Sequence, residues 1–402
     1  MISNKVLSLS AVLVVTLTGL DADAQGQRDP AAYAERSRTI SARMEASGLA
    51  DPFIGVTTDG TVTPGLFPIT RTGVDTGPVV AGAIGFLQTL TPDQRNATQY
   101  PVDDLEWRKW GNQHIYLRQG ISFDEMNATQ RNAAWTLLDA SLSTKGLSLV
   151  ADIMRLNETL GELNDDNFLE YGEGKYWLTV LGEPSASEPW GFQLDGHHLI
   201  VNFFVLGDQV VMTPAFWGSE PAVATSGKYA GTRIMDAEQD KALELINSLN
   251  TTQQSKAILM TNKTGNNILA QAFSDNLILD YAGIKISEFT PAQRARLMEL
   301  IGLYINNMEP DAARARLAEI SAHLDATWFA WIGDTQDDSV FYYRIQSPVL
   351  LIEFDHETPV GLSHIYPRGV PYREHIHAVV RTPNGNDYGK DLLRQHYATQ
   401  TH

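Results

Sequence analysis

The chain has 402 residues, no cysteine and a formal net charge of −18 at pH 7. Without cysteine, thiolate-bound zinc, iron–sulfur clusters and thiol catalysis are excluded, so any metal must be held by His, carboxylate or amide oxygen. The excess of acidic residues argues against nucleic acid and anionic membrane as partners.

The first 24 residues predict a cleaved secretory signal. Lys5 precedes an apolar run from Val6 to Leu20, and Ala22-Asp23-Ala24 supplies a small-x-small pattern for cleavage. The run is too short and too rich in Ser and Thr to cross a bilayer comfortably. We therefore expect a secreted or periplasmic protein whose mature chain begins near Gln25. Residues 25–85 are rich in Gly, Thr and Pro and predict an irregular N-terminal arm.

The remainder of the chain contains an internal repeat. At a constant offset of 151 residues, segments 176–184, 190–194 and 198–203 match segments 327–335, 341–345 and 349–354 in their apolar positions. Repeats of this kind are typical of a duplicated supersecondary unit. The sequence therefore predicts two equivalent blocks of strands.

Similar helix starts lie upstream of each strand block. Thr91 and Asn127 in the first half, and Asn250 and Thr290 in the second, are cap-type residues followed by Gln or Arg in the first turn. Turn signals at Asp195-Gly196, Gly207-Asp208 and Asn384-Gly385 punctuate the strands.

These patterns predict an α+β fold with two repeats, residues 86–236 and 237–402. Each repeat reads as helices followed by an antiparallel hairpin or sheet, and we expect the two to be fused about a pseudo-twofold. The strand blocks should pair or pack face to face, because half-sheets this short need a partner to bury both faces. The alternative is two separate domains joined near Ala237.

His197 and His198 begin an apolar strand-like run. Neighbouring residues of a strand point to opposite faces, so only one of the two is expected to join a given site. We choose His198 as a metal ligand because it shares a face with Asn202, and we keep His197 as a catalytic candidate. The alternative is a histidine packed in the core with its nitrogens satisfied.

Glu353, Asp355 and His356 end the apolar run 349–354. A buried carboxylate is costly unless it is paired, hydrogen-bonded or bound to metal. Glu353 is therefore a candidate metal ligand, with an ion pair to Arg344 or Arg381 as the alternative. Asp355 or His356 would move protons.

His375 and His377 lie two residues apart and share a face if the segment is a strand. Two imidazoles on a rigid element form a good half of a metal site. The alternative is an exposed pair that binds nothing. Arg381, further along the same face, would orient an anionic group or a ligand. If the repeats meet around their axis, His198, Glu353, His375 and His377 should surround one point.

Several motifs resemble an uncharacterised bacterial family, catalogued as domain of unknown function number 3500, over about Phe86 to His396. The carriers are the Leu-Thr-Pro-x-Gln-Arg type helix starts, 182–184, Trp190-Gly191, 196–199 with Asn202-Phe203, 343–346, and 375–377 with 381–393. The resemblance implies membership and a fold, but no settled activity.

The function we expect is that of an exported metal-dependent enzyme acting on a small molecule or polymer. Zinc, iron, copper and manganese all suit mixed N and O donors, and hydrolysis by metal-activated water is favoured over oxidation. The sequence contains no G-x-S-x-G, H-E-x-x-H, P-loop or G-x-G-x-x-G motif. The alternative is a non-catalytic secreted ligand-binding protein.

Overall fold

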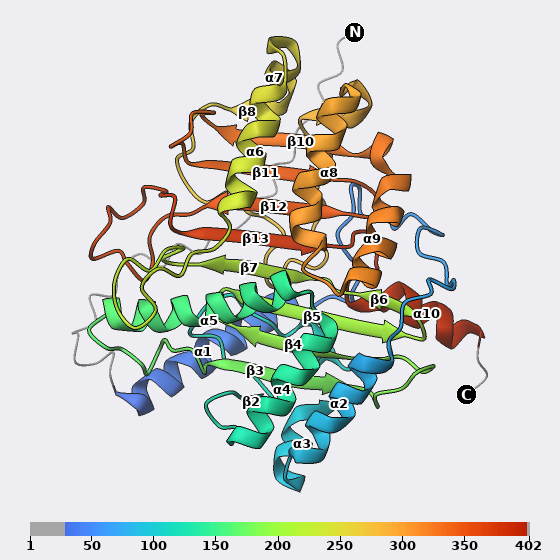
Figure 1. The fold of residues 1–402 in the computed structure, drawn as a ribbon, viewed down its shortest axis with the longest axis vertical. Coiled ribbons are helices and arrows are strands. Elements are labelled where there is room, and N and C mark those ends of the chain that lie inside the picture. The colour runs from blue at the N-terminus through green and yellow to red at the C-terminus, as the bar shows by residue number, and fades with distance from the viewer. Residues whose placement is uncertain (1–28, 400–402) are drawn as a thin grey trace.

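A computed structural model describes residues 29–399, in which a 13-stranded mixed sheet carries helices mainly on one face (Figure 1). The signal expected at residues 1–24 lies outside the described residues. Among the described residues, no helix combines the length and apolar character needed to span a membrane.

The elements of the first half are α1 Pro30–Gly48, α2 Gly77–Thr89, α3 Pro92–Thr98, β1 Gln99–Tyr100, η2 Leu105–Arg108, β2 Ile121–Ser122, α4 Ala128–Ser141, α5 Thr144–Leu163, β3 Tyr176–Leu181, β4 Trp190–Gly196, β5 Leu199–Leu206, β6 Gln209–Val211 and β7 Ala215–Ser219. Those of the second half are α6 Asp236–Ser248, α7 Thr251–Ala257, β8 Ile258–Met260, β9 Ile284–Lys285, η3 Ile286–Glu288, α8 Pro291–Ile305, α9 Pro310–Ala322, η4 Leu324–Ala326, β10 Trp328–Gly333, β11 Phe341–Gln346, β12 Leu351–His356, β13 Ile376–Arg381, η5 Asp387–Gly389 and α10 Lys390–Thr399.

The two strand blocks pair edge to edge in one sheet. The strand order is β1-β3-β4-β5-β7-β13-β12-β11-β10-β8, with β2, β6 and β9 pairing at the sides. Only the β1–β3 and β8–β10 pairs are parallel. At the centre, β7 and β13 run antiparallel, with Phe216 opposite Val379 and Gly218 opposite His377. The seam between the halves is therefore made of ordinary ladder hydrogen bonds.

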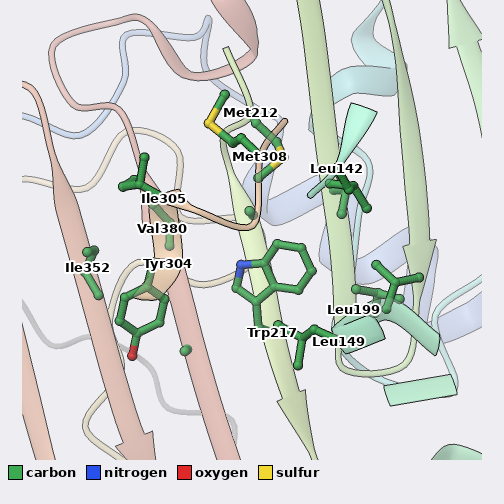
Figure 2. Packing of buried hydrophobic residues seen from close by; sticks show 14 of the residues in the cluster. Leu142, Leu149, Leu199, Met212, Trp217, Tyr304, Ile305, Met308, Ile352 and Val380 are labelled. Carbon is green, nitrogen blue, oxygen red and sulfur yellow. The ribbon is translucent and has the colours of Figure 1, made fainter. Parts of the chain in front are cut away.

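The two faces of the sheet are covered differently. Alternate strand residues pack with helices α2, α4, α5, α6, α8 and α9 into the larger apolar core. Figure 2 shows this core crossing the seam, where Trp217 of β7 lies between Leu149 and Leu199 on one side and Tyr304 and Val380 on the other. The opposite face carries many polar side chains and is covered by the N-terminal arm, loops and α10.

The predicted helix starts are confirmed. Thr91, Asn127, Asn250 and Thr290 each accept a hydrogen bond from the backbone N–H three residues on, and a Gln at that third position bonds back to the cap N–H. These are reciprocal capping boxes, which satisfy two backbone donors at once.

The segment 25–85 is less irregular than expected. Helix α1 occupies Pro30–Gly48 and α2 begins at Gly77, so the irregular part lies between them. Asp29 caps α1 and Pro30 stands in its first turn; an Asp cap and an early proline are start signals that composition alone does not show.

The turn between β4 and β5 lies two positions later than predicted. Asp195 and Gly196 belong to β4, and His197-His198 form the two-residue connection to Leu199. The two histidines therefore do not alternate along a strand, and their rings stack with centroids 3.9 Å apart. The Gly207-Asp208 turn joins β5 to β6 as expected.

Candidate metal centre

Three histidines from the two halves of the chain converge at the end of the seam. His198 comes from the β4–β5 turn, His377 from β13, and His375 from the residue before β13 begins. Their Nε2 atoms are separated by 2.9 Å (198–377), 3.1 Å (375–377) and 3.3 Å (198–375). The exposed fraction is 5 % for His198, 1 % for His375 and 5 % for His377. Among the described residues, they are the one group whose spacing suits a metal ion.

The backbone of His198 is in an unusual conformation that directs its ring to this point. Its φ is +61°, in the left-handed region, and its N–H donates to the carbonyl of Asn112 at 3.1 Å. Asn, Asp and His are the non-glycine residues most often found there, at a cost of order 1 kcal/mol or more. A tight hairpin thus presents an imidazole instead of the glycine that such a turn usually has.

Outer contacts orient the other two rings. Nδ1 of His375 donates to the carbonyl of Thr358 at 2.7 Å. Nδ1 of His377 lies 3.0 Å from Oε1 of Glu357, outside the direction of a regular hydrogen bond, so charge attraction rather than a directed bond joins them. Metal-bound histidines usually have such a carbonyl or carboxylate on the second nitrogen, which fixes the tautomer.

These contacts direct the ring nitrogens at one another. Burial, followed by the charges of the neighbouring histidines, lowers the pKa of His198 well below its ordinary value. Burial also lowers the pKa of His375, although the nearby Glu220 carboxylate acts to raise it. With its proton on Nδ1, His375 presents Nε2 as an acceptor toward Nε2 of His377 at 3.1 Å and Nε2 of His198 at 3.3 Å. Either an N–H of a neighbouring imidazole or a metal ion can lie between these nitrogens.

The distances fit an ion held by three imidazoles. Nitrogens about 2.0–2.1 Å from zinc and at tetrahedral angles are about 3.3–3.4 Å apart, and at right angles about 2.9 Å apart. The observed separations of 2.9–3.3 Å span this interval. Because no fourth His, Asp or Glu joins the group among the described residues, at least one coordination position is left for water or substrate.

Glu353, expected as a fourth ligand, does not join the histidine group in the described structure. Its oxygens accept hydrogen bonds from the hydroxyl of Tyr342 at 2.6 Å and from the N–H groups of Ala270 and Leu269 at 2.7 Å and 3.1 Å. Strand alternation correctly predicted that Glu353 lies on the same face of the sheet as His377. Its carboxylate is bound by backbone N–H groups of the segment 261–283, which covers this face.

Asp355 and His356 do not lie at the metal point either. Asp355 is the cross-strand neighbour of His377, yet its carboxylate binds Nζ of Lys263 at 3.0 Å and the N–H of Asn267 at 2.5 Å. His356 points to the helix-covered face, where Nδ1 accepts from the N–H of Phe341 and Nε2 contacts Oε1 of Gln239, both at 3.0 Å. The expected proton transfer by either residue has no support in these contacts.

Arg381 is likewise a structural residue. It is fully buried and binds Asp275 at 2.9 Å and Asp387 at 3.1 Å, while Nε donates to the carbonyl of Ala270. In the described structure its guanidinium binds these partners and not the histidines.

Of the four predicted catalytic residues, only His197 touches the group. Its ring stacks on His198, and Nδ1 donates to Oδ1 of Asn157 at 2.8 Å. Burial lowers the pKa of His197 well below its ordinary value, and nearby positive groups add to the effect. His197 therefore packs as a neutral ring against His198.

Sequence reasoning missed the carboxylates that do approach the histidines. Glu357 follows Glu353 and Asp355 at the same two-residue spacing and could have been found by extending the alternation. Burial alone would raise the pKa of Glu357, but His377, His375 and Lys263 outweigh it and lower the pKa, so the carboxylate is charged. Glu220, 3.9 Å from Nδ1 of His375, follows β7 and carried no signal in the sequence.

Comparison with known proteins gives one match. The family described as "Protein of unknown function (DUF3500)" matches residues 72–390. No curated protein and no solved structure matches the chain. The matched region includes all three histidines, Glu357 and Glu220, and the chain belongs to the DUF3500 family.

Proposed function

We propose that this protein is an exported metal-dependent enzyme with one divalent ion held by His198, His375 and His377. The observation that carries the proposal is the set of three converging Nε2 atoms with no fourth protein ligand among the described residues. Structural zinc sites are usually closed by four protein ligands, whereas catalytic sites keep a position open.

Hydrolysis is the better-supported reaction class. Three imidazoles without a carboxylate match the ligand set of zinc hydratases, while many iron oxygenases use two histidines and one carboxylate. A bound divalent ion would supply Lewis acidity and a water acidic enough to act as a nucleophile near neutral pH. Imidazole ligands favour zinc, copper or iron over manganese, which prefers oxygen donors.

The protein's own contribution is orientation and charge balance. Thr358 and Glu357 hold the rings of His375 and His377 with Nε2 inward. The charged carboxylate of Glu357 lies 3.0 Å from His377, and the carboxyl group of Glu220 lies 3.9 Å from His375. Acidic groups at these positions would offset part of the charge of a dication.

Metal analysis tests the proposal directly. Protein purified without a histidine tag should contain about one equivalent of zinc, copper or iron, and His375→Ala/His377→Ala should contain none. His323→Ala, at the end of α9, is the matched histidine control and should keep the metal. A metal-free, folded wild-type protein that takes up no ion when titrated would refute the proposal.

A non-catalytic binding protein is the second candidate, and burial favours it. The three histidines are at most 5 % exposed, and none of them lines the cavity beside Trp217 or the groove beside Lys390. A panel of chromogenic esters, phosphoesters and amides separates the candidates. Turnover that is lost with the metal and restored with it supports the enzyme; stabilisation by metal without turnover supports the binder.

We also propose the internal duplication, with residues 86–236 and 237–402 as its halves. The order α2-α3-β1-β2-α4-α5-β3-β4-β5-β7 corresponds to α6-α7-β8-β9-α8-α9-β10-β11-β12-β13. In each half a capping-box glutamine donates to its counterpart on the other capped helix: Gln130 to Gln94 at 2.8 Å, and Gln293 to Gln253 at 3.0 Å. The shared side-chain contact supports common descent more strongly than strand order does.

Export is the last part of the proposal and rests on the pattern of residues 1–24. N-terminal sequencing of protein recovered from periplasm or medium should give a chain that starts near Gln25. Recovery of the intact Met1 chain from the cytoplasm would contradict it.

A further inference from the structure

The connection between β12 and β13 reaches the histidines at both of its ends. Residues 357–375 contain no helix or strand, and the two ends of this loop supply Glu357, the Thr358 carbonyl and His375 to the site. The ends are fastened to each other, because the N–H of Glu357 donates to the carbonyl of His375 at 2.8 Å and that of Tyr372 to the carbonyl of Glu357 at 3.1 Å.

One carboxylate holds the middle of this loop. Glu220, which is 2 % exposed, accepts hydrogen bonds from the N–H groups of Val360 at 3.0 Å, Gly361 at 2.7 Å and Leu362 at 3.2 Å. It also accepts from the hydroxyl of Tyr372 at 2.9 Å. Four hydrogen bonds converge on this one side chain, so it supplies much of the loop's attachment.

Apolar contacts beneath the loop are few, and its outer surface is open to solvent. Leu362 packs with Leu160 and Tyr171 in a small cluster separate from the two main cores. Val360, Ile365 and Val370 are 60 %, 53 % and 55 % exposed. Segments with few buried apolar contacts are the ones that open locally, well below the free energy of global unfolding.

We propose that residues 359–373, the part of this loop between the segments that hold the rings, form a gate over the histidine cluster and that Glu220 is its latch. The proposal rests on the proposed function, since the gate controls access to the same metal point. Release of the carboxylate would free three backbone amides and Tyr372 together, so the loop would open as a unit. The closed loop keeps water and competing ligands from the ion, and the open loop admits substrate.

The test uses the full chain after treatment with chelator, so that it does not depend on metal binding. Diethyl pyrocarbonate modification, followed by peptide mass spectrometry, gives the rate at which His375 and His377 become accessible. Hydrogen exchange gives the opening of amides 360–362. In Glu220→Gln both rates should rise about tenfold or more, as expected for the loss of one or two hydrogen bonds.

Glu162→Gln is the matched control. Glu162 also accepts a hydrogen bond from the backbone N–H of a neighbouring loop, that of Lys228 at 3.1 Å, but among the described residues it forms no hydrogen bond or ion pair with residues 359–373. The exchange rates and the histidine modification rates of this variant should equal those of the wild type. Tyr372→Phe removes only one bond to Glu220 and should accelerate both rates to a smaller extent, which keeps the test valid if Glu220→Gln fails to fold.

Unchanged rates in Glu220→Gln, or equal acceleration in Glu162→Gln, would overturn the gate. Failure of the proposed function is separate: it would appear as absent metal uptake in the wild type while the two rates still responded to the latch.

Discussion

The Nε2 atoms of His198 and His377 lie 2.9 Å apart although 179 residues separate the two histidines in the chain. The contact crosses the β7–β13 seam. His198 lies in the β4–β5 turn of the first half, and His377 lies on β13 of the second half, opposite Gly218 of β7. The ligand set therefore exists only when both halves are folded and paired.

Replacement of His198 by Asn should remove a ligand without disturbing the turn. Asn tolerates the left-handed conformation that His198 adopts, so the chelator-treated variant should be within about 1 kcal/mol of the wild type in urea unfolding. Metal affinity, measured by competition with a chromophoric chelator, should fall by more than the roughly 10–100-fold typical of losing an outer contact. An unchanged affinity would remove His198 from the ligand set.

Glu357→Gln and Glu353→Gln form a matched pair on one strand end. Glu357 contacts His377, so its loss should weaken metal binding about 10–100-fold. Glu353 instead binds Tyr342 and backbone amides, so Glu353→Gln should lower the free energy of unfolding by about 1–3 kcal/mol and leave metal affinity unchanged. The reverse pattern in chelator competition would restore Glu353 as a ligand.

Arg381→Met should destabilise the protein without affecting the metal. The substitution leaves Asp275 and Asp387 buried without this cation, and breaking a buried pair in this way typically costs about 3–5 kcal/mol. Urea unfolding measures the loss, and the metal content of the folded fraction should match that of the wild type. If metal content fell while stability held, Arg381 would have the ligand-orienting role expected from the sequence.

Glu106 should make stability depend on pH near neutrality. Burial raises its pKa from 4.5 to about 7, against a lowering by Lys109. The folded state then binds the proton more tightly than the unfolded chain, so the stability due to this group is full below pH 4.5 and is lost as the pH rises through 7.

A neutral Gln avoids that loss. Relative to the wild type, Glu106→Gln should therefore gain about 2–3 kcal/mol between pH 5 and pH 8. Urea unfolding of both proteins at the two pH values gives this difference, and a constant difference would contradict the raised pKa.

Gln130→Ala and Gln293→Ala should behave as equivalents. Each glutamine closes a capping box and donates to a helix-end carbonyl, that of Thr89 at 3.1 Å and that of Ser248 at 2.8 Å. Each substitution should cost about 1–3 kcal/mol in thermal or urea unfolding. A neutral effect in one half alone would show that the two contacts have different roles and would weaken the case for duplication.

The parts of the fold that local rules describe were predictable. Helix caps at Asn127 and Thr290, the Gly207-Asp208 turn and the shared face of His375 and His377 all follow from spacing of two or three residues. The similar strand patterns of the two halves extended this reach, because two strand blocks that pair in one sheet bring distant residues together. That argument led to the expected meeting of His198 with the other two histidines.

The partners of buried charges were not predictable. Alternation says which face Glu353 and Arg381 share, but not which covering segment lies on that face. Residues 261–283 have little periodicity, and nothing in their pattern indicates that Lys263, Ala270 and Asp275 would bind Asp355, Glu353 and Arg381. Glu353, Asp355 and Arg381 are the predicted site residues whose charged groups bind this irregular segment.

The position of the histidines at the end of the β7–β13 pairing has a mechanical consequence. An ion at this point would cross-link the two halves of the chain, since one of its nitrogen ligands comes from the first half and two come from the second. Unzipping the two central strands would dismantle its coordination at once. Release of the ion and separation of the two halves would then be one cooperative event. Slow exchange of the ion would indicate that the β7–β13 pairing rarely opens.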